Sequence, residues 1–482
     1  MAALKKNAIA KGLFWKILER FGVSGTQFIL QLVLARILDP SHYGTLSMMV
    51  VFTTLSKVFI QRGFNTALVQ NNDVTDEDFS SVFWVSLSIA CGLYTLLFIS
   101  APFIAQVYKM PEIVVPFRVL CLILLPGSLN SVQLAKINRE MNFKKVFTSN
   151  VLGIVVAGIA GVTVALLGGG LWALVTQNLV NVITTCIVMR FTSKLKIRFV
   201  CNMQRVKVLF SFGWKLLVSS LIDTLYQDLR SLVVGLKYNS STLGFYNRGK
   251  HFPQFVGNVI NNSVSAVMLP AMSKTQDHPE KLKAMMRRSI SLSAYMIFPM
   301  MSGLAAVATP LVTILLTEKW LPCVPFMQIY CFIYAFQPVH VCNLQAINAV
   351  GRSDVFLKLE VVKKMYGIAF LLGAVIFFDS PISIAMTGLI TAWIGWFVNA
   401  YPNKKLVNYS YIEQIHDVLP TFLLAISMFG FVLWIGTLNI NVYLLLVIQI
   451  LCGVVYYIGL SILFKFEPFE YLLKQITQFR KG

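Results

Sequence analysis

The sequence predicts an all-α integral membrane protein of about 14 transmembrane helices, arranged as two six-helix lobes plus two C-terminal helices. Three observations support this class. The 482-residue chain is 57% hydrophobic and only 13% charged, with a mean hydropathy of +0.71, whereas soluble domains carry about 25% charged residues. Its apolar runs reach the roughly 20 residues that a membrane span needs. Its lysines and arginines also gather in alternate loops.

The predicted spans follow one another along the whole chain with short connections. Basic residues precede the first apolar run, but no small-residue cleavage site follows it, so we interpret it as an uncleaved span rather than a signal peptide. The fourteen predicted spans are 13–37, 42–66, 79–101, 113–135, 146–167, 170–192, 209–236, 241–271, 287–310, 322–350, 359–378, 382–401, 417–437 and 441–464.

The placement of Lys and Arg predicts the orientation, because cytoplasmic loops carry an excess of basic residues. Most of the 41 basic residues fall in segments on the same side as both termini, whereas the loops on the other side hold only Lys109, Lys237 and Lys319. We therefore expect a multi-pass protein with cytoplasmic N- and C-termini. The outside loops are too short for an external catalytic domain. No segment resembles a nucleic-acid-binding module, although the net charge is +21.

An internal repeat relates the two halves of the chain. Trp15-Lys16 aligns with Trp214-Lys215, and Gly44 aligns with Gly244. An offset of six spans leaves both halves in the same orientation, which predicts a parallel repeat. The predicted domains are an N-terminal lobe (1–192), a basic cytoplasmic linker (193–208), a C-terminal lobe (209–401) and a last region with two spans and a cytoplasmic tail (402–482).

Polar side chains recur at helical spacing within four of the predicted spans. Positions i, i+4, i+7 and i+11 share one face of a helix. A face of this kind is not stable against lipid, so it must meet protein or water, and we expect a hydrated cavity between the two bundles. The predicted cavity residues are Arg20, Gln27 and Gln31 in the first span, Lys57, Gln61 and Arg62 in the second, Asp223, Tyr226, Gln227 and Arg230 in the seventh, and Arg248, His251, Gln254, Asn258 and Asn261 in the eighth.

Structural interpretations of single residues remain open at this point. Arg20, Arg62 and Arg248 could extend to a membrane interface as readily as into a cavity. Asparagine and glutamine in spans often join neighbouring helices by hydrogen bonds, and His251 taken alone is more typical of a packed histidine.

The sign of the charge indicates the cargo. Basic residues within the spans outnumber the acidic ones, which are Glu19, Asp223 and Asp228. Such a cavity favours an anion; arginine suits phosphate, and the amides suit sugar hydroxyls. These observations predict a lipid-linked anionic saccharide. Glu19 and Asp223 are the candidates for coupling to an ion, whereas Asp228 points away from Arg230 and has no assigned role.

Catalytic and metal-binding motifs are missing from the sequence. We find no phosphate-binding P-loop, no H-E-x-x-H and no C-x-x-C, and the eight cysteines are scattered through apolar segments. We therefore expect no enzyme activity, no cofactor, no metal site and no disulfide framework.

Several segments resemble a known family. They are "LARILDPSHYGTLSMMVVFTTLSKVFIQRGFNTALVQNNDVTDEDFSSVFW", "APFIAQVYKMPE", "NREMNFK", "GGGLWALV", "AVMLPAMSKTQD" and "DLRSLVVGLKYNSSTLGFYNRGKHFPQ". Together they are similar to polysaccharide repeat-unit flippases of the Wzx type, in the multidrug/oligosaccharidyl-lipid/polysaccharide exporter superfamily. The similarity covers residues 12–350 clearly and is closest to the branch that serves colanic acid and teichuronic acid.

The resemblance implies a fold, a cargo and a location. It implies two lobes around a central cationic cavity, and alternating access that moves an undecaprenyl-pyrophosphate-linked oligosaccharide across the bacterial inner membrane. It also implies a role in exopolysaccharide, capsule or O-antigen synthesis, with polysaccharide polymerase and export machinery as partners. Family members carry functional arginines on the first, second, seventh and eighth helices; Arg20, Arg62, Arg230 and Arg248 are the candidates for these positions. The alternative is a cation-coupled multidrug exporter of the same superfamily, against which the basic excess counts.

Overall fold

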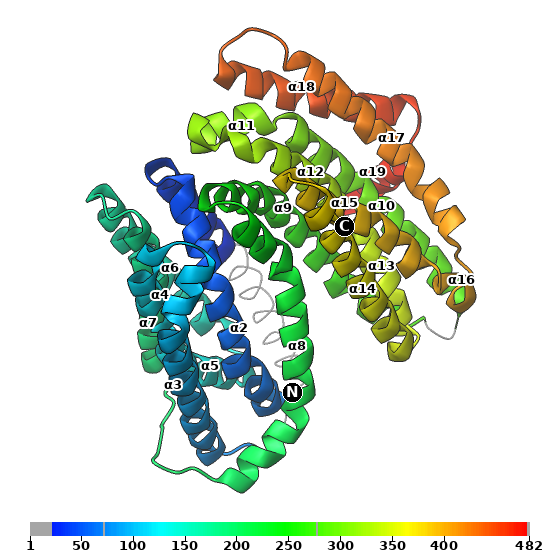
Figure 1. Cartoon of the computed structure of the whole chain (residues 1–482). Coiled ribbons are helices and arrows are strands. Elements are labelled where there is room, and N and C mark those ends of the chain that lie inside the picture. Colours follow the sequence, from blue (N-terminus) through cyan, green and yellow to red (C-terminus); the bar gives the residue numbers. More distant parts are fainter. Residues whose placement is uncertain (1–21, 71–72, 276–277, 480–482) are drawn as a thin grey trace. The chain divides into compact units, whose positions relative to one another are not determined.

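The computed structural model describes residues 22–70, 73–275 and 278–479, and every regular element in these ranges is a helix (Figure 1). The predicted all-α class is thereby confirmed. A helix pairs its own backbone N–H and C=O groups, which lipid cannot do for it. The chain divides into two compact units, Met1–Gly244 and Phe245–Gly482.

The first unit contains long helices joined by short turns. α3 begins with a capping box, in which Thr75 Oγ1 accepts from the Asp78 N–H while the Asp78 side chain accepts from the Thr75 N–H. The elements are Gly22–Ile37, α2 (Pro40–Gln70), α3 (Asp76–Val107), η1 (Pro111–Ile113), α4 (Val114–Cys121), α5 (Leu124–Arg139), α6 (Phe143–Leu166), α7 (Leu171–Ser193), α8 (Met203–Lys237) and the first residues of α9 (Ser240–Ser273).

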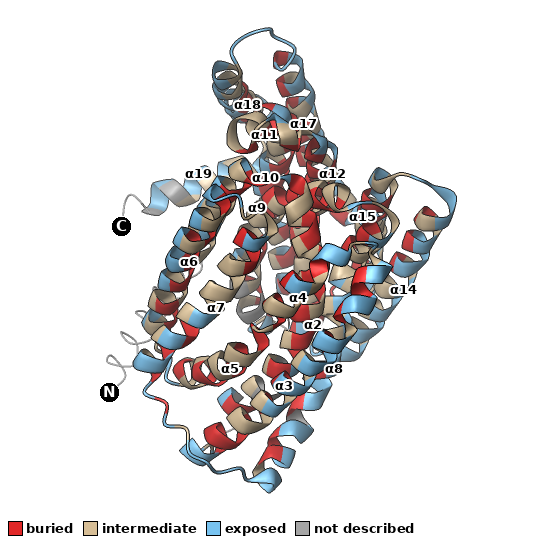
Figure 2. Ribbon diagram, turned by 60° about the vertical axis from the view of Figure 1, so that its left-hand side comes forward, coloured by how far each residue is buried: buried red, intermediate tan, exposed pale blue. Residues whose placement is uncertain are grey.

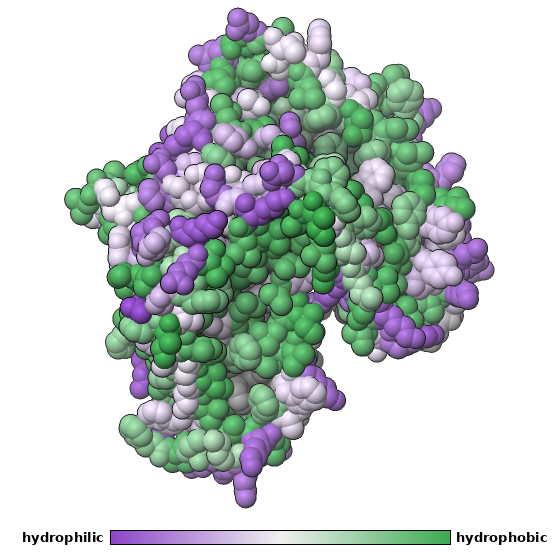
Figure 3. Space-filling view, viewed as in Figure 1, coloured by the Kyte–Doolittle hydropathy of each residue, from purple (hydrophilic) through white to green (hydrophobic). Residues whose placement is uncertain are grey.

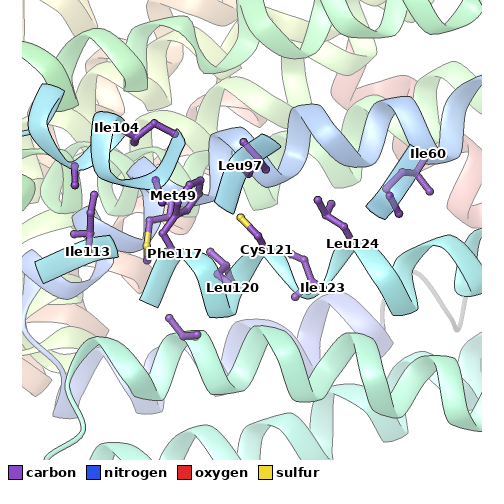
Figure 4. Packing of buried hydrophobic residues seen from close by; sticks show 14 residues of the cluster. Met49, Ile60, Leu97, Ile104, Ile113, Phe117, Leu120, Cys121, Ile123 and Leu124 are labelled. Atoms are coloured by element: carbon purple, nitrogen blue, oxygen red, sulfur yellow. The ribbon is translucent and has the colours of Figure 1, made fainter. Parts of the chain in front are cut away.

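A large apolar cluster of this unit forms where α2, α3, α4, α5 and α7 meet. Phe117 on α4 is fully buried, and its ring centroid lies 5.8 Å from that of Phe52, edge to face. Figure 4 shows Met49 and Leu120 beside it. Because lipid is as apolar as leucine, such a cluster is stabilised by close van der Waals packing rather than by removal from water.

The second unit starts within α9 and ends with an amphipathic helix. Its last spanning helices are delimited by side-chain caps at Ser410 and Asn441. The further elements are α10 (Pro279–Ala306), α11 (Ala308–Leu316), η2 (Glu318–Cys323), α12 (Val324–Ala335), α13 (Gln337–Ala349), α14 (Ser353–Phe377), α15 (Pro381–Ala400), α16 (Asn403–Leu406), α17 (Tyr411–Ile435), α18 (Val442–Leu463) and α19 (Glu467–Phe479).

A buried amide network ties α17 to this unit. Asn343 Nδ2 donates to Gln414 Oε1, and Gln414 Nε2 donates back to Asn343 Oδ1, both at 2.9 Å. Asn403 Nδ2 donates to Asn343 Oδ1 at 2.8 Å, and Trp396 Nε1 donates to Gln414 Oε1 at 3.2 Å. All three amide side chains are fully buried. Leaving one without a partner would cost about 1–3 kcal/mol, so the network holds α13, α15, α16 and α17 in one register.

The helices of the described ranges include nine that are long and apolar enough to cross a membrane, or ten if α8 is one bent span. α8 bends by 55° between Ser211 and Gly213. Of the first predicted span, 13–37, residues 13–21 lie outside the described residues and Gly22–Ile37 is a short helix. The remaining predicted spans are helical, but α9 and α14 carry many polar or charged residues, and 322–350 is interrupted at Phe336, between α12 and α13. A multi-pass membrane protein is therefore confirmed, while the number fourteen stays a prediction.

The outer surfaces of these helices are suited to lipid. Val455 and Leu463 on α18 are each 70% exposed, and α14 buries only Gly367, Leu371 and Ala374 (Figure 2). Figure 3 shows broad apolar areas, with hydrophilic residues gathered in smaller groups. Apolar area of this extent would be unfavourable in water but has no such cost against acyl chains.

Two glycines that the repeat aligns lie against each other. A methyl group on Gly44 would overlap the Ser240 carbonyl, and one on Gly244 would overlap the Pro40 carbonyl. Pro40 and Ser240 are the first residues of α2 and α9. The contact is therefore reciprocal, as a parallel repeat predicts, and it requires hydrogen as the side chain at both positions.

The linker between α7 and α8 is fastened to the start of α3. Arg205 Nε and Nη2 donate to the two carboxylate oxygens of Asp78, each at 3.0 Å, and the Asp78 side chain is only 3% exposed. Trp84 Nε1 donates to the Arg198 carbonyl at 3.0 Å, and the Asn202 N–H donates to Ser81 Oγ at 2.9 Å. The first turns of α3 thus bind both the first turn of α8 and the linker before it.

We expect Gly44→Ala to destabilise the protein, because the new methyl group meets backbone that cannot rotate away. The loss should be about 1–3 kcal/mol and should appear as a lower thermal unfolding midpoint of the purified protein. Gly92→Ala is the matched control: it lies within α3 with nothing near the added methyl group, so its midpoint should stay or rise. Equal midpoints for the two variants would contradict the close contact.

The Asp78–Arg205 pair should behave as one unit in a double-mutant cycle. Asp78→Asn and Arg205→Gln should each lower the unfolding midpoint, and the double variant should lose little more than one single variant, with a coupling of about 1–3 kcal/mol. Asp76→Asn is the control, since the Asp76–Lys136 pair is exposed on the Asp76 side. Additive losses would show that the two side chains act independently.

Candidate functional site

The predicted cavity residues fall into three groups by their placement. Glu19 and Arg20 lie outside the described residues, and the Arg62 side chain is likewise not described. Gln27, Gln227 and Asn258 are exposed, and Arg248 and Asn261 are buried. The half-buried members are Gln31, Lys57, Gln61, Asp223, Tyr226, Arg230, His251 and Gln254.

On α8 the structure brings two predicted residues together. The Arg230 guanidinium carbon lies 5.9 Å from the centre of the Tyr226 ring, one helical turn away. A cation near an aromatic face is attracted by the ring quadrupole, which orients the guanidinium. Both residues belong to the straight segment Gly213–Lys237, after the bend. Asp223 precedes Tyr226 by three residues and therefore lies on the same side of the helix.

The polar residues of α2 lie at a depth comparable with those of α8. Met48 on α2 packs against Gly235 on α8, and the two helices run in opposite directions, since α2 begins where α8 ends. At 1.5 Å per residue, Lys57 lies about 13 Å along α2 from Met48, and Tyr226 lies about 13 Å along α8 from Gly235. The first unit thus carries cationic and aromatic groups at one level.

On α9, which belongs mainly to the second unit, some of the predicted cavity residues are buried in helix packing. Arg248 is 5% exposed, and its guanidinium carbon lies 5.2 Å from the centre of the fully buried Trp320 ring. Asn261 Nδ2 donates to Gln337 Oε1 on α13. Asn258 stays exposed on the neighbouring face. The polar face of α9 therefore has one edge that packs against other helices and one edge that is exposed. No signal in the sequence distinguishes the residues of the two edges.

The part of the chain that the structure describes contains no group of side chains that could bind a metal ion. No three His, Cys, Asp or Glu side chains gather there in a way that could hold an ion. The predicted cavity residues that the structure describes on α2, α8 and α9 are basic residues, amides, one tyrosine, one histidine and the carboxylate Asp223.

Structural roles explain some residues in the family-like segments. Arg139, in "NREMNFK", donates from Nη1 to the Leu68 carbonyl near the end of α2 at 3.0 Å. It thereby satisfies one of the carbonyls that a helix end leaves unpaired. The sequence analysis does not predict the ion pair between Arg205 and Asp78. The available signal was an acidic segment and a basic segment predicted on the same side of the membrane.

Comparison with known proteins gives a consistent group of relatives. The teichuronic acid biosynthesis protein TuaB of Bacillus subtilis (strain 168) is 21% identical over 463 residues, which cover 94% of this chain and 95% of the relative. The succinoglycan biosynthesis transport protein ExoT of Rhizobium meliloti (strain 1021) is 25% identical over 319 residues, 65% of this chain and 64% of the relative. The lipopolysaccharide biosynthesis protein WzxC of Escherichia coli (strain K12) is 22% identical over 420 residues, 86% and 82% of the two chains.

Solved structures support the fold. The lipid II flippase MurJ in an inward closed conformation aligns with a TM-score of 0.74 at 16% identity, over 94% of this chain and 99% of that one. An inward-facing multidrug transporter of the MATE family, in the MOP superfamily, aligns with 0.62 at 14% identity, over 79% and 95%. The family model described as "polysaccharide biosynthesis protein" matches residues 33–325, more than half of the chain. The chain therefore belongs to this family of polysaccharide biosynthesis proteins.

Proposed function

We propose that this protein flips an undecaprenyl-pyrophosphate-linked oligosaccharide repeat unit across the bacterial inner membrane by alternating access, for exopolysaccharide, capsule or O-antigen synthesis. The observation that carries the proposal is an arginine within a membrane-spanning helix, Arg230 beside Tyr226, in a member of a polysaccharide biosynthesis family. A guanidinium at this depth is costly unless it serves a purpose, and a phosphate-bearing cargo is one.

The names of the relatives support a saccharide cargo. One is named a transport protein of succinoglycan biosynthesis, another a lipopolysaccharide biosynthesis protein, and the similar fold of MurJ belongs to a lipid II flippase. Movement of a saccharide attached to a lipid would account for these names together. The half-exposed faces of α2 and α8 would bind its headgroup, while the apolar outer surfaces let the lipid stay in the bilayer.

We assign roles by chemistry within this proposal. Arg230 binds a phosphate oxygen pair, and exposed amides such as Gln27 and Asn258 bind sugar hydroxyls. Asp223 restrains Arg230 or carries a coupling proton, and Glu19 is the second coupling candidate. Arg248 ranks below Arg230, because it would have to leave Trp320 to reach a cargo.

A multidrug exporter is the less supported alternative. The MATE likeness concerns the fold alone, and organic cations need acidic partners, whereas the α2 and α8 faces carry Lys57 and Arg230. The excess of Lys and Arg in alternate loops supports cytoplasmic termini as part of the proposal.

Deletion of the gene should cause the lipid-linked repeat unit to accumulate in the cytoplasmic leaflet, because synthesis continues while transfer stops. Mass spectrometry of extracted lipids measures the accumulation, and a sugar-specific reagent applied to spheroplasts reports which leaflet holds it. Restoration by a plasmid copy is the control. Normal polymer export with no accumulation would contradict the proposal.

Arg230→Ala should reduce polymer export roughly tenfold or more, since a charge-assisted hydrogen bond is worth about 1.5–3 kcal/mol. Arg230→Lys should retain part of the export, because lysine keeps the charge but not the planar fork. Lys237→Ala removes the same charge at the end of α8, where Lys237 lies against Tyr238, and should export normally. Normal export by Arg230→Ala at equal protein level would refute the assigned role.

A further inference from the structure

The second unit holds a cavity of about 1050 Å³ that the transport proposal does not use. It lies where α10, α17 and the end of α18 meet α19. Its wall is apolar and is formed by Leu292, Pro420, Leu423, Leu424, Leu460 and Phe464. Its rim is charged, so the cavity combines the two surfaces that an amphiphile requires.

The rim carries charges of both signs. Arg287 Nη2 binds Asp417 Oδ1 at 2.6 Å, and Tyr409 OH donates to Asp417 Oδ2 at 2.7 Å, so these charges satisfy each other. Outside this pair, the described rim residues include two basic and two acidic side chains that could contact a ligand: Arg288, Lys474, Glu467 and Glu470. The rim is therefore close to neutral but offers groups of both signs.

The position of α19 gives the depth of this rim. α19 directly follows α18, a membrane-spanning candidate, and is amphipathic: Leu473 is 47% exposed, while Tyr471 turns back toward Arg288 on α10. The Arg288 guanidinium carbon lies 4.6 Å from the centre of the Tyr471 ring. An amphipathic helix at the end of a span lies in the headgroup layer, which places the charged rim there and the apolar wall beside the acyl chains.

We propose that this cavity binds a membrane phospholipid with a zwitterionic headgroup, one that carries a phosphate and a free ammonium group. Arg288 and Lys474 bind the phosphate, Glu467 and Glu470 bind the ammonium, and an acyl chain lies on the wall of Leu423, Leu460 and Phe464. A phospholipid without the ammonium group leaves two glutamates unpaired beside its own negative charge, so it binds more weakly. The site rests on residues other than those assigned to the cargo and stands whether or not the transport proposal holds.

The test uses the full-length protein in detergent, with phosphatidylethanolamine, phosphatidylglycerol or phosphatidylcholine added to the micelles. Native mass spectrometry counts bound lipid, and thermal unfolding reports stabilisation by binding. We expect phosphatidylethanolamine to raise the midpoint most. Lys474→Gln and Arg288→Gln should weaken its binding about tenfold, while Lys281→Gln, on α10 but outside the cavity, should not. Glu470→Lys should reverse the preference in favour of phosphatidylglycerol.

Three outcomes would overturn the site. Equal stabilisation by all three lipids, in both the original chain and the Glu470→Lys variant, would mean that the rim does not discriminate between headgroups. A full shift with soluble phosphoethanolamine would mean that the apolar wall takes no part. Binding of a polyprenyl phosphate alone would assign the cavity to the cargo instead. Lys474 is exposed, so Lys474→Gln should leave the packing of α19 intact. This variant therefore tests the site even if Arg288→Gln detaches α19.

Discussion

The structure depends on the cost of an unpaired polar group in hydrocarbon. Each helix meets that cost for its own backbone, but the polar side chains inside the spans must find partners in the protein, in water or in a ligand. Arg248 meets it against the ring of Trp320, and Asn343 and Gln414 meet it in each other. Where water does not reach, such contacts determine which helices adjoin.

This constraint divides the polar residues of the spans into two kinds. Those that are fully buried, such as Gln414 and Asn343, hold helices in register and have no capacity left for a cargo. Those that remain half-buried or exposed, such as Lys57, Arg230 and Asn258, keep part of their surface available. A transporter needs both kinds, since the first fixes the scaffold and the second must exchange water for ligand. Residue type alone does not distinguish them: Arg248 and Arg230 look equivalent in the sequence but differ in burial.

The sequence was sufficient for the all-α membrane class, because apolar length and the placement of basic residues are one-dimensional signals. It also placed Tyr226 and Arg230 on one face, since helical periodicity is local. The number of spans stays a prediction, because hydropathy does not identify a span clearly in polar helices such as α9 or at helix breaks such as Phe336. The Asp78–Arg205 pair, the Asn343 network and the cavity beneath α19 join residues distant in the chain, and no single sequence records such pairings.

The contact between Gly44 and Gly244 has a further meaning. Each glycine lies against the first residue of the helix that bears the other, so the patch is self-complementary in the manner of an isologous interface. Two separate copies of a half-length chain could make the same contact with each other about a two-fold axis. The contact between the starts of α2 and α9 therefore has the geometry of a homodimer contact, made here within one chain.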